Sequence, residues 1–174
     1  MLGMVYSAVE HALPFVVETS LALGLAVFDG QEGIIHRPGG LMGVRLTSES
    51  RPVRYGPELQ QVLDSVDAMT PRGGPSYLVL ERSNGNYAQT AGGDGSFTAE
   101  WREVSGNSFR HWVAGLPGQS VTKSIKIKTN GATVIVKENE GLGATDVKAI
   151  LTAFAKQTAR PADYLWRETT DQFA

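Results

Sequence analysis

The segment from residue 76 to residue 137 constrains the fold most, because its apolar residues recur at every second position. Phe97, Ala99 and Trp101 alternate with polar residues, which makes one face of that segment apolar and the other polar. Asn130-Gly131 separates two further alternating segments and is typical of a two-residue hairpin turn. The pattern predicts consecutive antiparallel strands joined by tight turns.

The alternation predicts strands over residues 77–81, 87–91, 97–102, 108–113, 125–128 and 133–137. Shorter strands are expected at 25–28, 34–36 and 44–47, the last of which resembles an edge strand. In the final hairpin a two-residue turn would pair Ile127 with Val134 and Ile125 with Val136 on the buried face.

Helical periodicity occurs in three segments, residues 8–23, 57–66 and 145–154. Pro57 suits a first helical position, Thr145 can cap the last helix, and Pro161 ends it. Pro14 either kinks the first helix or opens a second, shorter one. We expect an α+β fold, an antiparallel meander of about five or six strands packed by two to three helices, in a single domain over residues 1–174.

The composition argues against several classes of function. The chain has 16 Lys and Arg against 18 Asp and Glu, a net charge of -2, which argues against nucleic-acid binding. It contains no Cys, which excludes disulfides, thiol catalysis and Cys-ligated metals. The apolar start lacks Lys and Arg and is interrupted by Glu10 and Glu18, unlike an export signal. We therefore expect a cytoplasmic protein that binds no membrane.

Known catalytic and metal-binding patterns are absent from the sequence. His11, His36 and His111 do not have the close spacing of metal ligands. Asp29, His36 and Ser20 can be imagined as a triad, but no Gly-x-Ser-x-Gly motif surrounds any serine. The glycine-rich run at 92–95 precedes a strand, which favours a hairpin turn over a phosphate loop. We predict no catalytic residue, cofactor or metal.

The polar strand faces leave two interpretations open. Glu100 and Arg102 share one face of their strand, opposite Trp101 and Glu103. That polar face is either solvated or meets a partner, and Trp112 serves either a core or an interface. A separate basic patch consists of Lys123, Lys126, Lys128 and Lys137. Because no aromatic residues are interleaved with these lysines to stack on bases, the patch favours a role in solubility over nucleic-acid binding.

The order of several short segments resembles small bacterial immunity proteins of secreted toxin systems. The first segments are Ala22-Leu23-Gly24-Leu25-Ala26-Val27-Phe28-Asp29-Gly30-Gln31 and Ile35-His36-Arg37-Pro38. The middle ones are Tyr77-Leu78-Val79-Leu80, Asn86-Tyr87-Ala88-Gln89-Thr90-Ala91-Gly92-Gly93 and Glu100-Trp101-Arg102, before a late helix and Trp166-Arg167. In that family the Tyr-x-Gln-x-Ala and Glu-aromatic-Arg segments lie in one antiparallel sheet.

The resemblance implies a binding protein without enzymatic activity. Its partner would be a cognate toxin domain encoded nearby, delivered by contact-dependent, type VI or related secretion and acting in the cytosol. We expect a monomer or weak homodimer whose exposed binding face includes Asp94, Glu100, Arg102, Trp112, Glu138 and Glu140. The alternatives are a secretion adaptor or chaperone for an effector, and a small enzyme that uses His36, Asp29 and a carboxylate.

Overall fold

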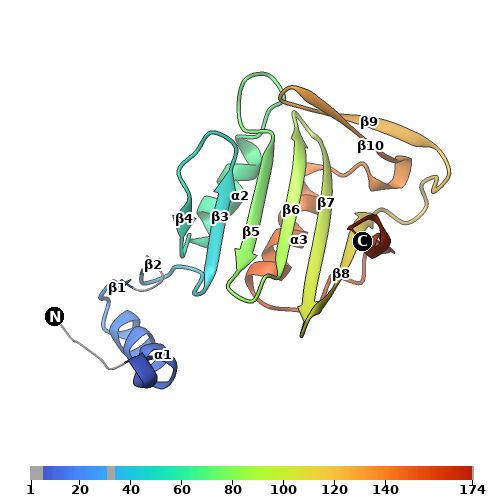
Figure 1. The fold of residues 1–174 in the computed structure, drawn as a ribbon. Coiled ribbons are helices and arrows are strands. Elements are labelled where there is room, and N and C mark those ends of the chain that lie inside the picture. The colour runs from blue at the N-terminus through green and yellow to red at the C-terminus, as the bar shows by residue number, and fades with distance from the viewer. Residues whose placement is uncertain (1–5, 31–33, 174) are drawn as a thin grey trace.

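The computed structural model describes residues 6–30 and 34–173. Within this part of the chain the fold is α+β, as expected: three α-helices, a seven-stranded antiparallel sheet and two small hairpins. Figure 1 shows the large sheet with helices behind it, and the N-terminal helix beside one end.

The helices are α1 (Tyr6–Ala22), α2 (Leu59–Asp67) and α3 (Ala144–Ala155), with 3-10 turns η1 (Glu138–Glu140) and η2 (Thr170–Phe173). The large sheet has the order β11 (Leu165–Glu168), β8 (Ser108–Gly115), β7 (Ser96–Ser105), β6 (Tyr87–Gly93), β5 (Tyr77–Arg82), β3 (Val44–Ser48) and β4 (Arg54–Tyr55). The two hairpins are β1 (Val27–Asp29) with β2 (Ile34–His36), and β9 (Ser124–Thr129) with β10 (Ala132–Lys137).

The strands β5 to β8 form the predicted meander. The turn between β6 and β7 consists of Asp94 and Gly95, whose φ angles are 52° and 86°. Positive φ at both central residues is what a tight hairpin with the natural strand twist requires. Asp94 and Gly95 therefore form the predicted turn, whereas Gly92 and Gly93 of the glycine-rich run are the last residues of β6. The β9–β10 register is also as predicted, with Ile127 opposite Val134 and Ile125 opposite Val136.

Two strand predictions need correction and one strand was not predicted, and long-range packing explains each. The segment that contains Val44 and Leu46 is not an edge strand, because both side chains are buried in the core and β3 lies between β4 and β5. The β9–β10 hairpin is a separate sheet that contacts β6 and β7, with Ile127 fully buried. The tail at 164–167 contributes β11, which pairs Trp166 with Ala114 of β8.

The helix boundaries differ from the sequence expectation by one or two residues. Helix α1 continues through Pro14 to Ala22. Helix α2 begins at Leu59 rather than at the proline, and the Gln61 side chain accepts a hydrogen bond from the Glu58 N–H at 3.1 Å. Helix α3 begins at Ala144, before the threonine that was expected to cap it. The start of this helix is capped by the Asp146 carboxylate, which accepts a hydrogen bond from the Gly143 N–H at 3.0 Å.

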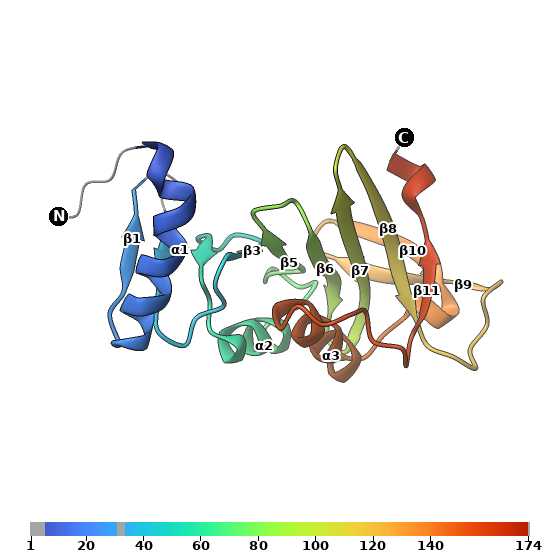
Figure 2. The ribbon, with the colours of Figure 1, turned by 90° about the horizontal axis from the view of Figure 1, so that it is seen from below.

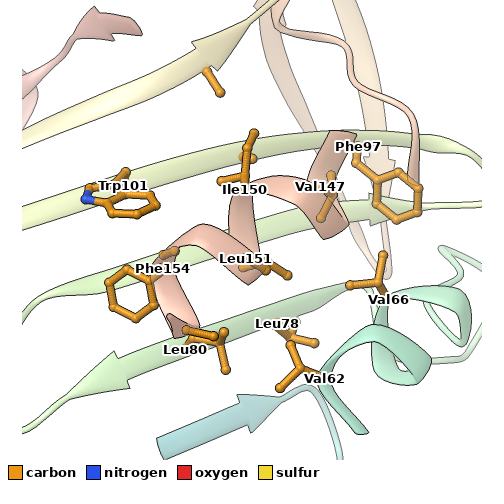
Figure 3. Close-up of a cluster of buried hydrophobic side chains, with 14 of the residues drawn as sticks. Val62, Val66, Leu78, Leu80, Phe97, Trp101, Val147, Ile150, Leu151 and Phe154 are labelled. Atoms are coloured by element: carbon orange, nitrogen blue, oxygen red, sulfur yellow. The ribbon is translucent and has the colours of Figure 1, made fainter. Parts of the chain in front are cut away.

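Helices α2 and α3 cover one face of the large sheet (Figure 2). Their buried side chains meet the alternate residues of β5 and β7 between helix and sheet (Figure 3). The labelled members of this core are Val62, Val66, Leu78, Leu80, Phe97, Trp101, Val147, Ile150, Leu151 and Phe154. Among the described residues, no helix combines the length and apolar character needed to cross a bilayer.

Candidate functional site

The face of the large sheet opposite α2 and α3 carries the alternate residues of the same strands. One row across β3, β5, β6, β7 and β8 contains Arg45, Glu81, Tyr87, Arg102 and His111. The neighbouring row contains Thr47, Val79, Gln89, Glu100 and Val113. We call these two rows, which α2 and α3 do not cover, the uncovered face, although His111 and Val113 on β8 are buried by other segments.

Arg102 lies on β7, between Tyr87 of β6 and His111 of β8. Its guanidinium is 4.1 Å from the centre of the Phe109 ring and 5.7 Å from that of the Tyr87 ring. A cation above aromatic faces is held by the negative charge of the rings, an interaction that strengthens where water is excluded. We call Tyr87, Glu100, Arg102, Phe109 and His111 the Arg102 cluster.

His111 anchors one side of the cluster and is 1% exposed. Its Nδ1 lies 2.7 Å from the Thr169 hydroxyl, and its Nε2 lies 3.2 Å from a Glu100 carboxylate oxygen. The C-terminal η2 turn adds Phe173, whose ring centre is 4.4 Å from that of His111. The C-terminal segment therefore helps to fix the imidazole in place.

Glu100 is oriented from two sides. The Gln89 side-chain amide donates a hydrogen bond to its carboxylate, and His111 faces the same oxygen. Burial raises the pKa of Tyr87, and the nearby Glu100 charge raises it further. Arg45 and Glu81 form an ion pair farther along the same face. The result is a set of charged and aromatic groups in fixed positions, among which arginine and tyrosine are enriched where proteins contact each other.

The structure places four of the six predicted contact residues at accessible or half-buried positions. Glu100 and Arg102 lie together in the Arg102 cluster. Asp94 lies in the β6–β7 turn, 3.3 Å from the Arg72 guanidinium, and Glu138 is half-buried in η1. The binding role of these residues stays a prediction, but only the first two are brought together.

Trp112 and Glu140 correct the prediction of one exposed face, because both are buried. Trp112 points to the side covered by the helices, and the Arg160 guanidinium lies 3.6 Å from its ring centre. The Glu140 carboxylate is 2.5 Å from the Arg167 Nε and accepts the Lys137 backbone N–H at 2.9 Å. Both residues therefore hold the fold together, and neither presents a contact surface.

A concave region lies between the N-terminal elements and the large sheet. Asp29 and His36 lie on the same side of the β1–β2 hairpin and line a largely apolar cavity of about 580 Å³. Arg45 and Glu81 line the opposite wall, and the His36 Nδ1 is buried without a hydrogen-bond partner among the described residues. Ser20, the third member of the imagined triad, does not line this cavity.

Several residues on or beside the uncovered face were not predicted from the sequence to contact a partner. Tyr87 and Gln89 alternate with the small residues of β6, and this parity alone places them beside Glu100 and Arg102 once β6 and β7 are paired. Phe109 follows from the same alternation on β8. Phe173 has no such local signal, since only the folded tail brings it to His111.

Within residues 6–30 and 34–173, no three His, Asp or Glu side chains are arranged to hold a metal ion. Comparison of the chain with models of protein families, with curated proteins and with solved structures finds no match. The function is therefore argued from the geometry of the uncovered face.

Proposed function

We propose that the protein is an immunity protein, which binds and neutralises a cognate secreted antibacterial toxin that acts in the cytosol. Neutralisation proceeds through a stoichiometric protein–protein complex rather than through catalysis. The observation that carries the proposal is the Arg102 cluster, a fixed set of charged and aromatic side chains on the sheet face opposite α2 and α3.

Fixed side chains suit tight binding because little conformational freedom is left to lose when a partner arrives. Arg102 is held between two rings, and Glu100 is held by Gln89 and His111. Arginine and tyrosine are among the residues that contribute most binding energy at protein interfaces. The face thus offers anchors of the kind found at the centre of stable complexes.

The division of the large sheet into a core face and an uncovered face also supports a role in binding. The core is complete on the opposite face, where Leu78, Leu80 and Trp101 pack under α3. Side chains on the uncovered face are therefore free to suit a partner without weakening that core. We propose that Tyr87, Gln89, Glu100, Arg102 and Phe109 form the central toxin contact.

The experiment is co-expression with the neighbouring open reading frame, with growth and co-purification as readouts. A toxic neighbour, rescue of growth and a one-to-one complex are expected. The variant Arg102→Glu should weaken the complex by about 30-fold or more, since loss of a central anchor costs about 2 kcal/mol or more. Arg51→Glu, an exposed change in the loop after β3, is the matched control and should leave affinity unchanged.

Circular dichroism of both variants distinguishes lost binding from lost folding. A neighbour that is neither toxic nor bound contradicts the proposed function. A tight complex that tolerates Arg102→Glu while the variant stays folded keeps the function but moves the contact elsewhere. A complex in which the effector retains full activity instead supports the alternative, a secretion adaptor or chaperone.

A small enzyme remains a second candidate because of one observation, the cavity that Asp29 and His36 share. An apolar cavity with converging titratable groups is a usual place for a substrate. A ligand screen on the isolated protein tests this candidate. A ligand that binds the protein but not the His36→Ala variant would support it, and absence of any such ligand would count against it.

A further inference from the structure

The charge of the protein is unevenly distributed. The segment that contains the β9–β10 hairpin, residues 121–137, has four lysines and no Asp or Glu. The other 12 Lys and Arg residues stand against all 18 Asp and Glu residues. A strongly basic hairpin is therefore attached to an otherwise acidic protein, and its field attracts anions locally although the net charge is -2.

Two of these lysines line an open groove of about 850 Å³. Lys126 and Lys128 lie on the exposed side of β9. Arg72, from the loop between α2 and β5, and Asp94, from the β6–β7 turn, also line this groove. We call this depression the lysine groove.

The cations of the groove are available to a ligand. Within the described part of the chain, neither the Lys126 nor the Lys128 ammonium forms an ion pair with a carboxylate. Arg72 does pair with Asp94, but its side chain is 86% exposed. An exposed ion pair of this kind contributes little and exchanges readily for another anion.

The groove is held in shape by contacts on its other side. Ile127, between the two lysines, is fully buried against the end of β6. At the hairpin tip the Asn130 N–H donates to the Ser76 hydroxyl at 2.8 Å, and that hydroxyl donates to Glu49 at 2.7 Å. The lysine stems therefore start from a fixed strand rather than from a loose loop.

We propose that the lysine groove binds an extended acidic segment of a protein partner. Lys126 and Lys128 are two residues apart on a strand, which spaces them by about 7 Å on the same side. An extended peptide places its own alternate side chains at the same spacing, so Asp or Glu at every second position matches the two lysines. The groove thus favours alternating over clustered acidic residues.

Nucleic acid fits the groove less well. Single-stranded nucleic acid is held largely by bases that stack on aromatic rings. None of the described residues that line the groove is aromatic. Two lysines and one arginine also provide few phosphate contacts, which are the main source of affinity for a nucleic acid backbone.

The test uses the full chain and a fluorescent peptide of alternating Glu and Ser. We expect saturable binding that weakens as salt is added, because the charges are exposed. A second peptide of the same composition, with its glutamates in one block, should bind several-fold more weakly. The double variant Lys126→Glu/Lys128→Glu should weaken binding of the alternating peptide by about tenfold or more.

The control is Arg51→Glu/Lys156→Glu, which changes the net charge equally at exposed positions outside the groove. It should leave peptide binding nearly unchanged. Equal losses in both double variants, or absence of saturable binding, would overturn the proposal. Tighter binding of single-stranded DNA than of the peptide would overturn it in favour of a nucleic acid ligand. None of these outcomes depends on the toxin, so failure here leaves the proposed function intact.

Discussion

The two faces of the large sheet are built from alternate residues of the same strands, yet they differ in almost every side-chain property. On β5, Leu78 and Leu80 are fully buried under the helices, whereas Val79 and Glu81 between and after them are half-exposed. Alternation along a strand therefore separates two tasks within one segment. Burial on one side stabilises the fold, and polar display on the other is free to serve recognition.

The pair β7–β8 shows the same division with larger side chains. Trp101 faces Trp112 on the covered side, and Arg102 faces His111 on the uncovered side. Trp101 packs with Phe154 and Trp166, while His111 lies beside Glu100 and the Arg102 guanidinium lies over the Phe109 ring. A change of one position along either strand thus exchanges a structural residue for a candidate contact residue.

The largest effect should come from the core of the covered face. Leu80→Ala should lower the free energy of unfolding by about 3 kcal/mol, because it removes a fully buried side chain and leaves a cavity. Val79→Ala, the adjacent change on the uncovered face, should cost about 1 kcal/mol or less. Urea unfolding measures both, and equal losses would contradict the division between the two faces.

A somewhat smaller effect is expected at the buried Glu140–Arg167 pair. Glu140→Ala should destabilise the protein by roughly 2 kcal/mol, because it leaves Arg167 without its partner although that side chain is one-third exposed. Glu138→Ala, two residues earlier, should change stability by less than about 0.5 kcal/mol. Thermal unfolding compares the two, and a tolerated Glu140→Ala would return this residue to the candidate contact surface.

At alkaline pH, the tyrosines on the two sides of the large sheet should contribute unequally to the loss of stability. Burial raises the pKa of Tyr164 to about 12, helped by Asp146, whose carboxylate accepts the phenol O–H at 3.2 Å. The unfolded chain loses this proton near pH 10, so stability should fall as pH rises from about 10 toward 12.

Urea unfolding at about pH 9 and about pH 11 checks this slope. Tyr164→Phe should reduce the fall in stability between the two pH values. Tyr87→Phe, on the uncovered face, removes a phenol whose pKa is also raised by burial and serves as the comparison. A fall that is the same in wild type and Tyr164→Phe would contradict the assignment.

The smallest effect should be that of the exposed ion pair on the uncovered face. Arg45→Met removes the partner of Glu81 and should cost about 0.5 kcal/mol or less at moderate salt. The cost should shrink further as salt is added, because both side chains are exposed. A salt-independent loss above about 1 kcal/mol would show that this row contributes to stability as the covered face does.

Local patterns predicted much of the fold. The alternation at Phe97, Ala99 and Trp101 and the Asn130-Gly131 turn were sufficient for the meander and for the register of β9 with β10. Such features involve residues that are neighbours in sequence, where turn geometry and side-chain period leave few choices.

Features that depend on distant residues were not predictable in the same way. Glu140 looks like a surface carboxylate until Arg167, which is 27 residues away, is brought beside it. Trp112 occupies the covered side because the pairing of β7 with β8 places it opposite Trp101. For the candidate site, the sequence named Glu100 and Arg102 correctly as neighbours on one strand face, but the aromatic rings around Arg102 come from other strands.

The order of the strands has a consequence for how the protein behaves at high concentration. The outermost strands of the large sheet are β4, with two residues, and β11, with four. A border this short offers few free backbone N–H and C=O groups to another chain. The long strands that would be the best templates for fibril growth, β6 and β7, are paired on both sides. Crowding should therefore rarely add strands from other copies to the large sheet.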